Sequence, residues 1–218
     1  MDRILEPEIM DDPAQAEAYA RADFSDSNQL FVDRLVAQFG GAFREVVDLG
    51  CGPADVTVRL ARALPAARLT AVDGSEEMLA LARKKIRAAR LSSRITLRLG
   101  RLPGVELPDH SFDAVSSKDM LHHLADAQVL WREAQRLGAR GAAVYVMDLV
   151  RPTSPLEARE IVERVAHREH PILKEDFYNS LCAAFTVAEV RAQLAAAGLR
   201  LTVEQASDRH MMVKGRLP

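Results

Sequence analysis

Two acidic residues, each at the end of an apolar run, are the first whose positions suggest chemistry. Asp48 closes VVD and is followed by the turn Gly50-Cys51-Gly52, and Asp73 closes the next apolar run, LTAVD. Glycines at such a turn let a ligand approach the main chain, because no Cβ stands in the way. We therefore expect a ligand site where these two runs end.

The acidic residues favour a nucleoside that carries no phosphate. The dinucleotide-binding pattern G-x-G-x-x-G requires a glycine at position 55, where this chain has Asp55, and an acid there would repel a pyrophosphate. Asp48 suits a cationic group for the same reason. Asp73 stands where a carboxylate can accept two hydrogen bonds from a ribose diol. A positive group and a ribose together indicate S-adenosylmethionine.

A second group of chemically useful residues follows a later apolar run. Lys118, His122 and His123 lie in or directly after FDAVSSKDMLHHL. Methyl transfer from a sulfonium requires an acceptor held in line with the methyl group, and an acceptor of high pKa also needs a base, for which histidine is suited near neutral pH. We predict these three residues as catalytic candidates. The alternatives are that the two histidines are structural and that Lys118 forms an internal ion pair with Asp119.

The segments that carry these residues alternate between strand-like and helix-like patterns. Strands are expected at 44–50, 67–73, 94–100, 112–118, 141–150, 199–205 and 209–215. Helices are expected at 13–21, 28–39, 55–64, 75–90, 126–137, 152–169 and 186–197, with a connector over 171–179.

This alternation predicts an α/β fold, Rossmann-like and doubly wound, with helices on both faces of a parallel sheet. The last two strands are so close in sequence that they must pair antiparallel, which makes a seven-stranded, mostly parallel sheet with a C-terminal antiparallel hairpin. The acid-rich start predicts an N-terminal helical lid over 1–40. The remaining domain, 41–218, carries a helical insertion at about 151–185.

The order of the motifs resembles a known family. VVDLGCGPAD, AVDGSEEML and LPDHSFDAVSSKDMLHHL, followed by the hairpin, look like the class I S-adenosylmethionine-dependent methyltransferases. They are most similar to the small-molecule branch that includes the ubiquinone/menaquinone C-methyltransferases. The resemblance covers about 42–150, and the tail by topology only. It implies S-adenosylmethionine as cofactor, S-adenosylhomocysteine as product and a small-molecule acceptor.

The resemblance also implies roles for individual residues. Asp48 matches the acid that orders the glycine loop and reaches the methionine amino group, and Asp73 matches the ribose acid. The family often has an acid after the third strand that contacts the adenine, where this chain has Arg101, so we expect the Leu102 main chain to make that contact. The expected cofactor-binding residues are Asp48, Gly50, Cys51, Gly52, Asp73, Gly74, Met78, Leu102, Ser117 and Lys118.

The family's acceptor sites draw residues from the lid and from the insertion. The residues of those segments that suit a substrate pocket are Tyr19, Phe24, Asn28, Tyr178 and Asn179. Buried packing would explain the aromatic residues equally well.

The composition of the chain argues against several classes of protein. The formal net charge of −2 does not favour a protein that coats nucleic acid, and two cysteines are too few for a disulfide framework. No apolar run approaches the roughly 20 residues of a membrane span, so we expect a cytoplasmic protein, as a monomer or homodimer. No metal is expected, because Glu163, His167 and His170 share a helix face without an evident fourth ligand.

Other functions stay open at this point. Eight basic residues and no acid between Arg83 and Arg101 make an RNA methyltransferase the first alternative. The missing adenine acid leaves room for a cofactor-binding protein that transfers no methyl group, and an NAD-dependent oxidoreductase is the remaining alternative.

Overall fold

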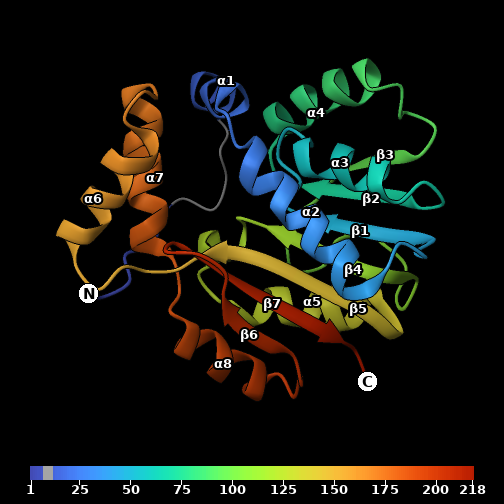
Figure 1. Ribbon diagram of the computed structural model, residues 1–218. Coiled ribbons are helices and arrows are strands. Elements are labelled where there is room, and N and C mark those ends of the chain that lie inside the picture. Colours follow the sequence, from blue (N-terminus) through green and yellow to red (C-terminus); the bar gives the residue numbers. More distant parts are fainter. Residues whose placement is uncertain (7–11) are drawn as a thin grey trace.

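The computed structural model describes residues 1–6 and 12–218, and the part of the predicted lid at 7–11 lies outside the described residues. The strands are β1 Glu45–Leu49, β2 Arg68–Asp73, β3 Ile95–Leu99, β4 Phe112–Lys118, β5 Gly138–Leu149, β6 Thr202–Gln205 and β7 His210–Arg216. The helices are α1 Pro13–Arg21, α2 Ser25–Phe39, α3 Asp55–Ala63, α4 Glu76–Ala88, α5 Gln128–Leu137, α6 Pro155–Ala166, α7 Pro171–Ala183, α8 Val187–Ala196 and a 3₁₀ turn, η1, Leu121–His123 (Figure 1).

The strands form a seven-stranded sheet in the order β3-β2-β1-β4-β5-β7-β6. β1 to β5 run parallel, and β7 pairs antiparallel with both β5 and β6. The predicted fold class, with its C-terminal antiparallel pair, is confirmed. The carboxyl ends of β1, β2 and β4 therefore share one edge, which is where open α/β sheets bind their ligands.

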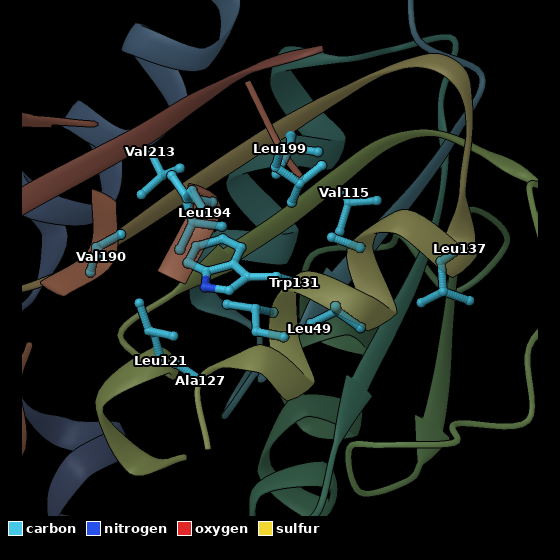
Figure 2. Close-up of a cluster of buried hydrophobic side chains, with 14 of the residues drawn as sticks. Leu49, Val115, Leu121, Ala127, Trp131, Leu137, Val190, Leu194, Leu199 and Val213 are labelled. Atoms are coloured by element: carbon cyan, nitrogen blue, oxygen red, sulfur yellow. The ribbon is translucent and has the colours of Figure 1, made fainter. Parts of the chain in front are cut away.

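Alternate strand residues bury themselves in two different cores. Val47 and Leu49 of β1 face α5 and α8, whereas Val46 of the same strand faces α2, α3 and α4. Figure 2 shows Trp131 of α5 at the centre of the first core, beside Leu49, with side chains from α8 and β7 around it. A sheet covered on both faces accounts for the near-continuous apolar runs in its strands.

Side-chain caps begin several helices where the sequence predicts a start. Ser75 accepts a hydrogen bond from the Met78 main-chain nitrogen (3.2 Å) ahead of α4. Thr186 and Glu189 form a reciprocal capping box at the start of α8. These capping hydrogen bonds fix the first turns of two helices that flank the sheet.

The predicted connector over 171–179 is wrong, because α7 spans Pro171–Ala183. Pro171 is its first residue, a position that proline favours because its missing N–H is not needed there. The predicted helix over 152–169 also ends earlier, at Ala166, so His167 and His170 are not on one helix. β5 begins at Gly138, directly after α5, rather than at 141.

Helices α6 and α7 form a separate layer with α1. In Figure 1 they stand beside the carboxyl end of the sheet, and α1 contacts both α4 and α7. Their shared apolar cluster includes Ile161 and Leu181. Among the described residues, no helix is long and apolar enough to cross a bilayer.

The first residues of the chain are anchored beside this layer. The Arg3 guanidinium donates hydrogen bonds to the main-chain oxygens of His122 (2.8 Å), Leu124 (2.8 Å) and Ala183 (2.5 Å). It also stacks on the Phe185 ring, 3.8 Å from its centroid. Arg3 thus joins η1 to the end of α7.

Candidate functional site

A cavity of about 620 Å³ lies at the carboxyl ends of the parallel strands. We call one side the strand-edge half, formed by the ends of β1, β2 and β3 with the loops into α3 and α4. The other side, the lid half, is formed by α1, the end of β4, η1, α7 and the start of β7. Of the ten expected cofactor-binding residues, all but Ser117 line the cavity; the Ser117 hydroxyl donates to the Leu49 main-chain oxygen (2.8 Å) and is buried.

The glycine loop after β1 has a backbone that most residues do not adopt. Gly50, Gly52 and Ala54 have φ values of 73°, 51° and 64°, and an alanine in this left-handed region carries a steric cost that glycine does not. A Cβ at Gly50 would lie 2.4 Å from Cγ of Met120. The loop therefore needs its glycine at position 50, both for conformation and for space.

Asp73 connects this loop to the start of α4. Its Oδ2 accepts a hydrogen bond from the Gly52 nitrogen (2.7 Å), and its Oδ1 accepts one from the Ser75 nitrogen (2.9 Å). Because an ionised carboxylate has about four acceptor positions, the group can still accept bonds from a ligand. Asp73 lines the cavity and is suited to hold a diol there.

Asp48 is buried at the base of the same loop. It accepts hydrogen bonds from the hydroxyls of Thr57 (2.6 Å) and Ser116 (2.9 Å), and so connects β1 to α3 and β4. Burial, which disfavours the charged form, raises the pKa of Asp48 to about 6. A cationic ligand group beside it would favour the ionised form again.

Asp55 lines the cavity and also takes part in a hydrogen-bond network with side chains of the protein. It accepts hydrogen bonds from the side chains of Asn28 (2.8 Å) and Arg59 (2.8 Å), and Lys85 lies 3.4 Å away. Burial alone would raise the pKa of Asp55, but these donors lower it below its usual value. Asn28, a predicted substrate residue, lines the cavity while its amide connects α2 to α3.

Two neighbouring loops add to the cavity wall on the side of Asp73. Gly74 and Met78 follow β2, and Arg101 and Leu102 follow β3; all four line the cavity. Leu102 also packs against the core beneath α5. This places the expected adenine-binding residues together.

In the lid half, Lys118 and Asp119 form the ion pair considered above. Burial alone would raise the pKa of Asp119, but Lys118 and the neighbouring histidines together lower that pKa below its usual value. His210 of β7 lines the cavity nearby, and burial lowers its pKa to about 4, which leaves it neutral at pH 7. Sequence reasoning missed His210, since nothing in RHMMVKG indicates which strand lies beside it.

His122 lies between two carboxylates, that of Asp148 on β5 and that of Glu6 near the start of the chain, and His123 lies close to Glu6. His122 is 3% exposed, and its Nδ1 lies 2.7 Å from Oδ1 of Asp148 at the end of β5. Oε1 of Glu6 lies 3.4 Å from Nε2 of His122 and 3.2 Å from Nδ1 of His123. Burial alone would lower the pKa of His122, but Asp148 raises it overall, and burial raises the pKa of Glu6.

The face of α7 that lines the cavity differs from the predicted one. Leu173, Asp176, Phe177 and Ser180 line it, at the spacing of one helix face, and neither Tyr178 nor Asn179 does. The Tyr178 ring instead lies under the Arg159 guanidinium, 4.8 Å from its carbon, in the layer between α6 and α7.

The two aromatic candidates of the lid do lie at the cavity. The Tyr19 and Phe24 rings are 4.9 Å apart at their centroids, and both residues line the cavity wall. Burial raises the pKa of Tyr19, so its hydroxyl stays protonated at neutral pH.

Part of the basic stretch between 83 and 101 serves the fold. The Arg94 guanidinium donates to main-chain oxygens of Ala61, Leu64 (3.0 Å) and Pro65 (2.7 Å), at the end of α3. Lys85 reaches Asp55, as described above. Positive charge in this stretch is therefore not by itself a sign of RNA binding.

Comparison with known proteins agrees with this geometry. Residues 46–141 match the family described as "Methyltransferase domain". A demethylmenaquinone methyltransferase of Lactobacillus johnsonii is 32% identical over 111 residues, 50% of this chain and 46% of the relative. A ubiquinone/menaquinone biosynthesis C-methyltransferase of Geobacter sulfurreducens is 29% identical over 115 residues, 52% of this chain and 45% of the relative.

A solved structure resembles nearly the whole chain. The S-adenosylmethionine-dependent methyltransferase of Aquifex aeolicus superposes with a TM-score of 0.74 over 96% of this chain and 100% of its own, at 18% identity, which shows the fold. The chain spans about half the length of the curated relatives it matches. Residues 46–141 of this chain are therefore similar to a methyltransferase domain, and the chain shares the fold of the S-adenosylmethionine-dependent methyltransferase of Aquifex aeolicus.

Proposed function

We propose that the whole protein transfers a methyl group from S-adenosylmethionine to a small-molecule acceptor. The observation that carries the proposal is one cavity that joins the acids of the strand-edge half, Asp48 and Asp73, to the polar groups of the lid half. The similarity to quinone-biosynthesis methyltransferases supports an acceptor of small-molecule size.

The residues of the strand-edge half fit this cofactor in three respects. Gly50 and Gly52 line the cavity without a side chain, and a Cβ at Gly50 would clash with Met120. Asp73 retains acceptor capacity for a ribose diol, and Asp48 gains its charge most readily beside an ammonium group. The bound cofactor would supply an electrophilic methyl group, and the protein would bring the acceptor into line with it.

The acceptor, on this proposal, lies in the lid half. Tyr19, Phe24 and Phe177 supply apolar and aromatic surface, while Lys118, His122 and His123 supply the polar groups that orient or deprotonate it. The first residues of the chain, with α1 and α2, act as the lid. Light scattering after size exclusion decides between the predicted monomer and homodimer.

The test measures binding and transfer separately. Calorimetry should show S-adenosylhomocysteine binding and no NAD binding. Incubation with methyl-labelled cofactor should then place label in a small-molecule fraction of a cell extract and not in its RNA fraction. NAD binding without S-adenosylhomocysteine binding would contradict the cofactor assignment, label confined to RNA would contradict the acceptor class, and cofactor binding without any transfer would support the non-catalytic alternative.

A further inference from the structure

Three potential metal-binding atoms converge beside the lid half. Glu6, His122 and His123 each offer one such atom, and these atoms all lie within 4.8 Å of one another. The two measured oxygen–nitrogen distances are 3.4 Å and 3.2 Å. Ligand atoms about 2.1 Å from a common metal are roughly 3.0–3.4 Å apart in octahedral or tetrahedral geometry. These two edges of the cluster therefore have the length expected around a small cation.

The hydrogen-bonding of His122 leaves its second ring nitrogen facing a carboxylate. Its Nδ1 faces Asp148, so in the neutral ring Nδ1 carries the proton and Nε2 presents a lone pair toward the carboxylate of Glu6. Two lone pairs that face each other repel, and His122 is too buried for water to screen them. Either an added proton or a metal ion has to lie between them.

The surroundings of the cluster favour the metal. A metal-binding histidine almost always donates its other ring N–H to a carboxylate or carbonyl, and Asp148 accepts from His122 in this way at 2.7 Å. The carboxylate of Glu6 is held too, because the Ser180 hydroxyl donates to both of its oxygens (3.1 and 3.3 Å). Arg3 fixes the main chain of η1 and of the segment that carries Glu6. Hydrogen-bonding partners that orient the ligand side chains in this way are typical of metal sites in proteins.

We propose that Glu6, His122 and His123 bind a divalent transition-metal ion of the zinc or ferrous class. Two imidazoles and one carboxylate are a ligand set that suits these ions. Three protein ligands leave at least one coordination position for a small molecule, and both histidines line the cavity. The site goes beyond the proposed methyl transfer and shares His122 and His123 with the proposed acceptor site. None of its residues lies in the strand-edge half, so metal binding and cofactor binding can be tested separately.

The experiment uses the full-length, untagged protein after treatment with a chelator. Titration with Zn²⁺ in a calorimeter should give one saturable site per chain, and Co²⁺ should give a visible d–d absorption band that Zn²⁺ abolishes. If neither ion gave saturable binding, the proposal would be overturned. The contact between His122 and Glu6 would then be explained by a shared proton. S-adenosylhomocysteine binding, measured in the same metal-free sample, should be unaffected, which separates this site from the cofactor site.

Variants identify the ligands. Glu6→Gln and His123→Ala should each weaken Zn²⁺ binding at least tenfold, and Asp148→Asn, which acts through His122, by about 10- to 100-fold. The matched control is Glu163→Gln, an exposed glutamate on α6 that pairs with Lys174 and should leave Zn²⁺ binding unchanged. His123→Ala removes a ligand from the half-buried side of the cluster and keeps the hydrogen bond between His122 and Asp148. Zn²⁺ binding that is equally tight in Glu6→Gln, His123→Ala and the control would overturn the assignment.

Discussion

The two halves of the cavity are built over very different distances along the chain. In the strand-edge half, Asp48 accepts hydrogen bonds from Thr57, nine residues away, and from Ser116 of the adjacent strand, 68 residues away. Asp73 accepts one from Gly52, 21 residues away. In the lid half, Glu6 meets Ser180 across 174 residues, and Arg3 meets the His122 carbonyl across 119. One half therefore follows from neighbouring strand ends, while the other exists only after the whole chain has folded.

The comparison is tested most strongly at Asp73. Replacement by alanine removes the acceptor of the Gly52 and Ser75 nitrogens and the proposed ribose ligand, so S-adenosylhomocysteine binding should weaken about 100-fold or more. Calorimetry measures this. The control is Asp113→Ala, which also removes an acceptor of two main-chain nitrogens, those of Arg44 and Glu45, but lies outside the cavity. If both variants lowered affinity equally, the effect would belong to the fold and not to the site.

The second test concerns the charge of Asp48. Its folded pKa of about 6 exceeds the ordinary value of 3.8, so its contribution to stability is complete below pH 4 and is lost as the pH rises through 6. Asp48→Asn removes this dependence. Relative to the variant, the wild type should lose up to roughly 3 kcal/mol of unfolding free energy between pH 4 and pH 8.

Urea denaturation of both proteins across that pH range measures the difference. The same variant should bind S-adenosylhomocysteine about tenfold more weakly at pH 8, because the amide does not attract the ammonium group. Parallel stability curves for the two proteins would show that Asp48 does not titrate in this window.

The lid half is tested by two neighbours on α7. Phe177→Ala should raise the KM for the acceptor about tenfold, since it removes apolar surface from the cavity, and should leave cofactor affinity unchanged. Tyr178→Ala, whose ring lies toward α6, should leave that KM within about twofold. Steady-state kinetics with the acceptor identified by label transfer measures the KM of both variants. A larger effect at Tyr178 would mean that α7 presents its other face to the substrate.

The smallest effect is expected on the outer surface of α4. Lys84 and Arg87 are exposed and do not line the cavity. Replacement of both by glutamine should change neither cofactor affinity nor transfer to a small molecule by more than about twofold. A large loss of methyl transfer in this double variant would favour the RNA methyltransferase alternative. It would also mean that the acceptor contacts the protein outside the lid half.

Sequence patterns predicted the strand-edge half because its parts are local. A strand end, a turn with two glycines and an acid can be recognised without knowing what packs against them, and Asp48 and Asp73 do lie at the cavity. The length of α7 could not be recognised in this way. That helix buries one face against α6 and turns another to the cavity, so its apolar residues do not form the single stripe that marks an amphipathic helix.

The lid half could not be predicted because its contacts depend on tertiary structure. His122 and His123 were identified, but Asp148, His210 and Glu6 were not. Asp148 and His210 reach the site through the pairing of β5 with β7, and Glu6 through the anchoring of Arg3. No spacing in the sequence encodes either arrangement.

The position of β7 has a consequence for how the protein is made. β7 follows β6 in the chain but lies between β6 and β5 in the sheet, so a nascent chain that still lacks β7 leaves β6 without the strand that joins it to β5. The wall that carries His210 is therefore completed only after β7 has been made, and until then the β5 edge is open to pairing with other chains.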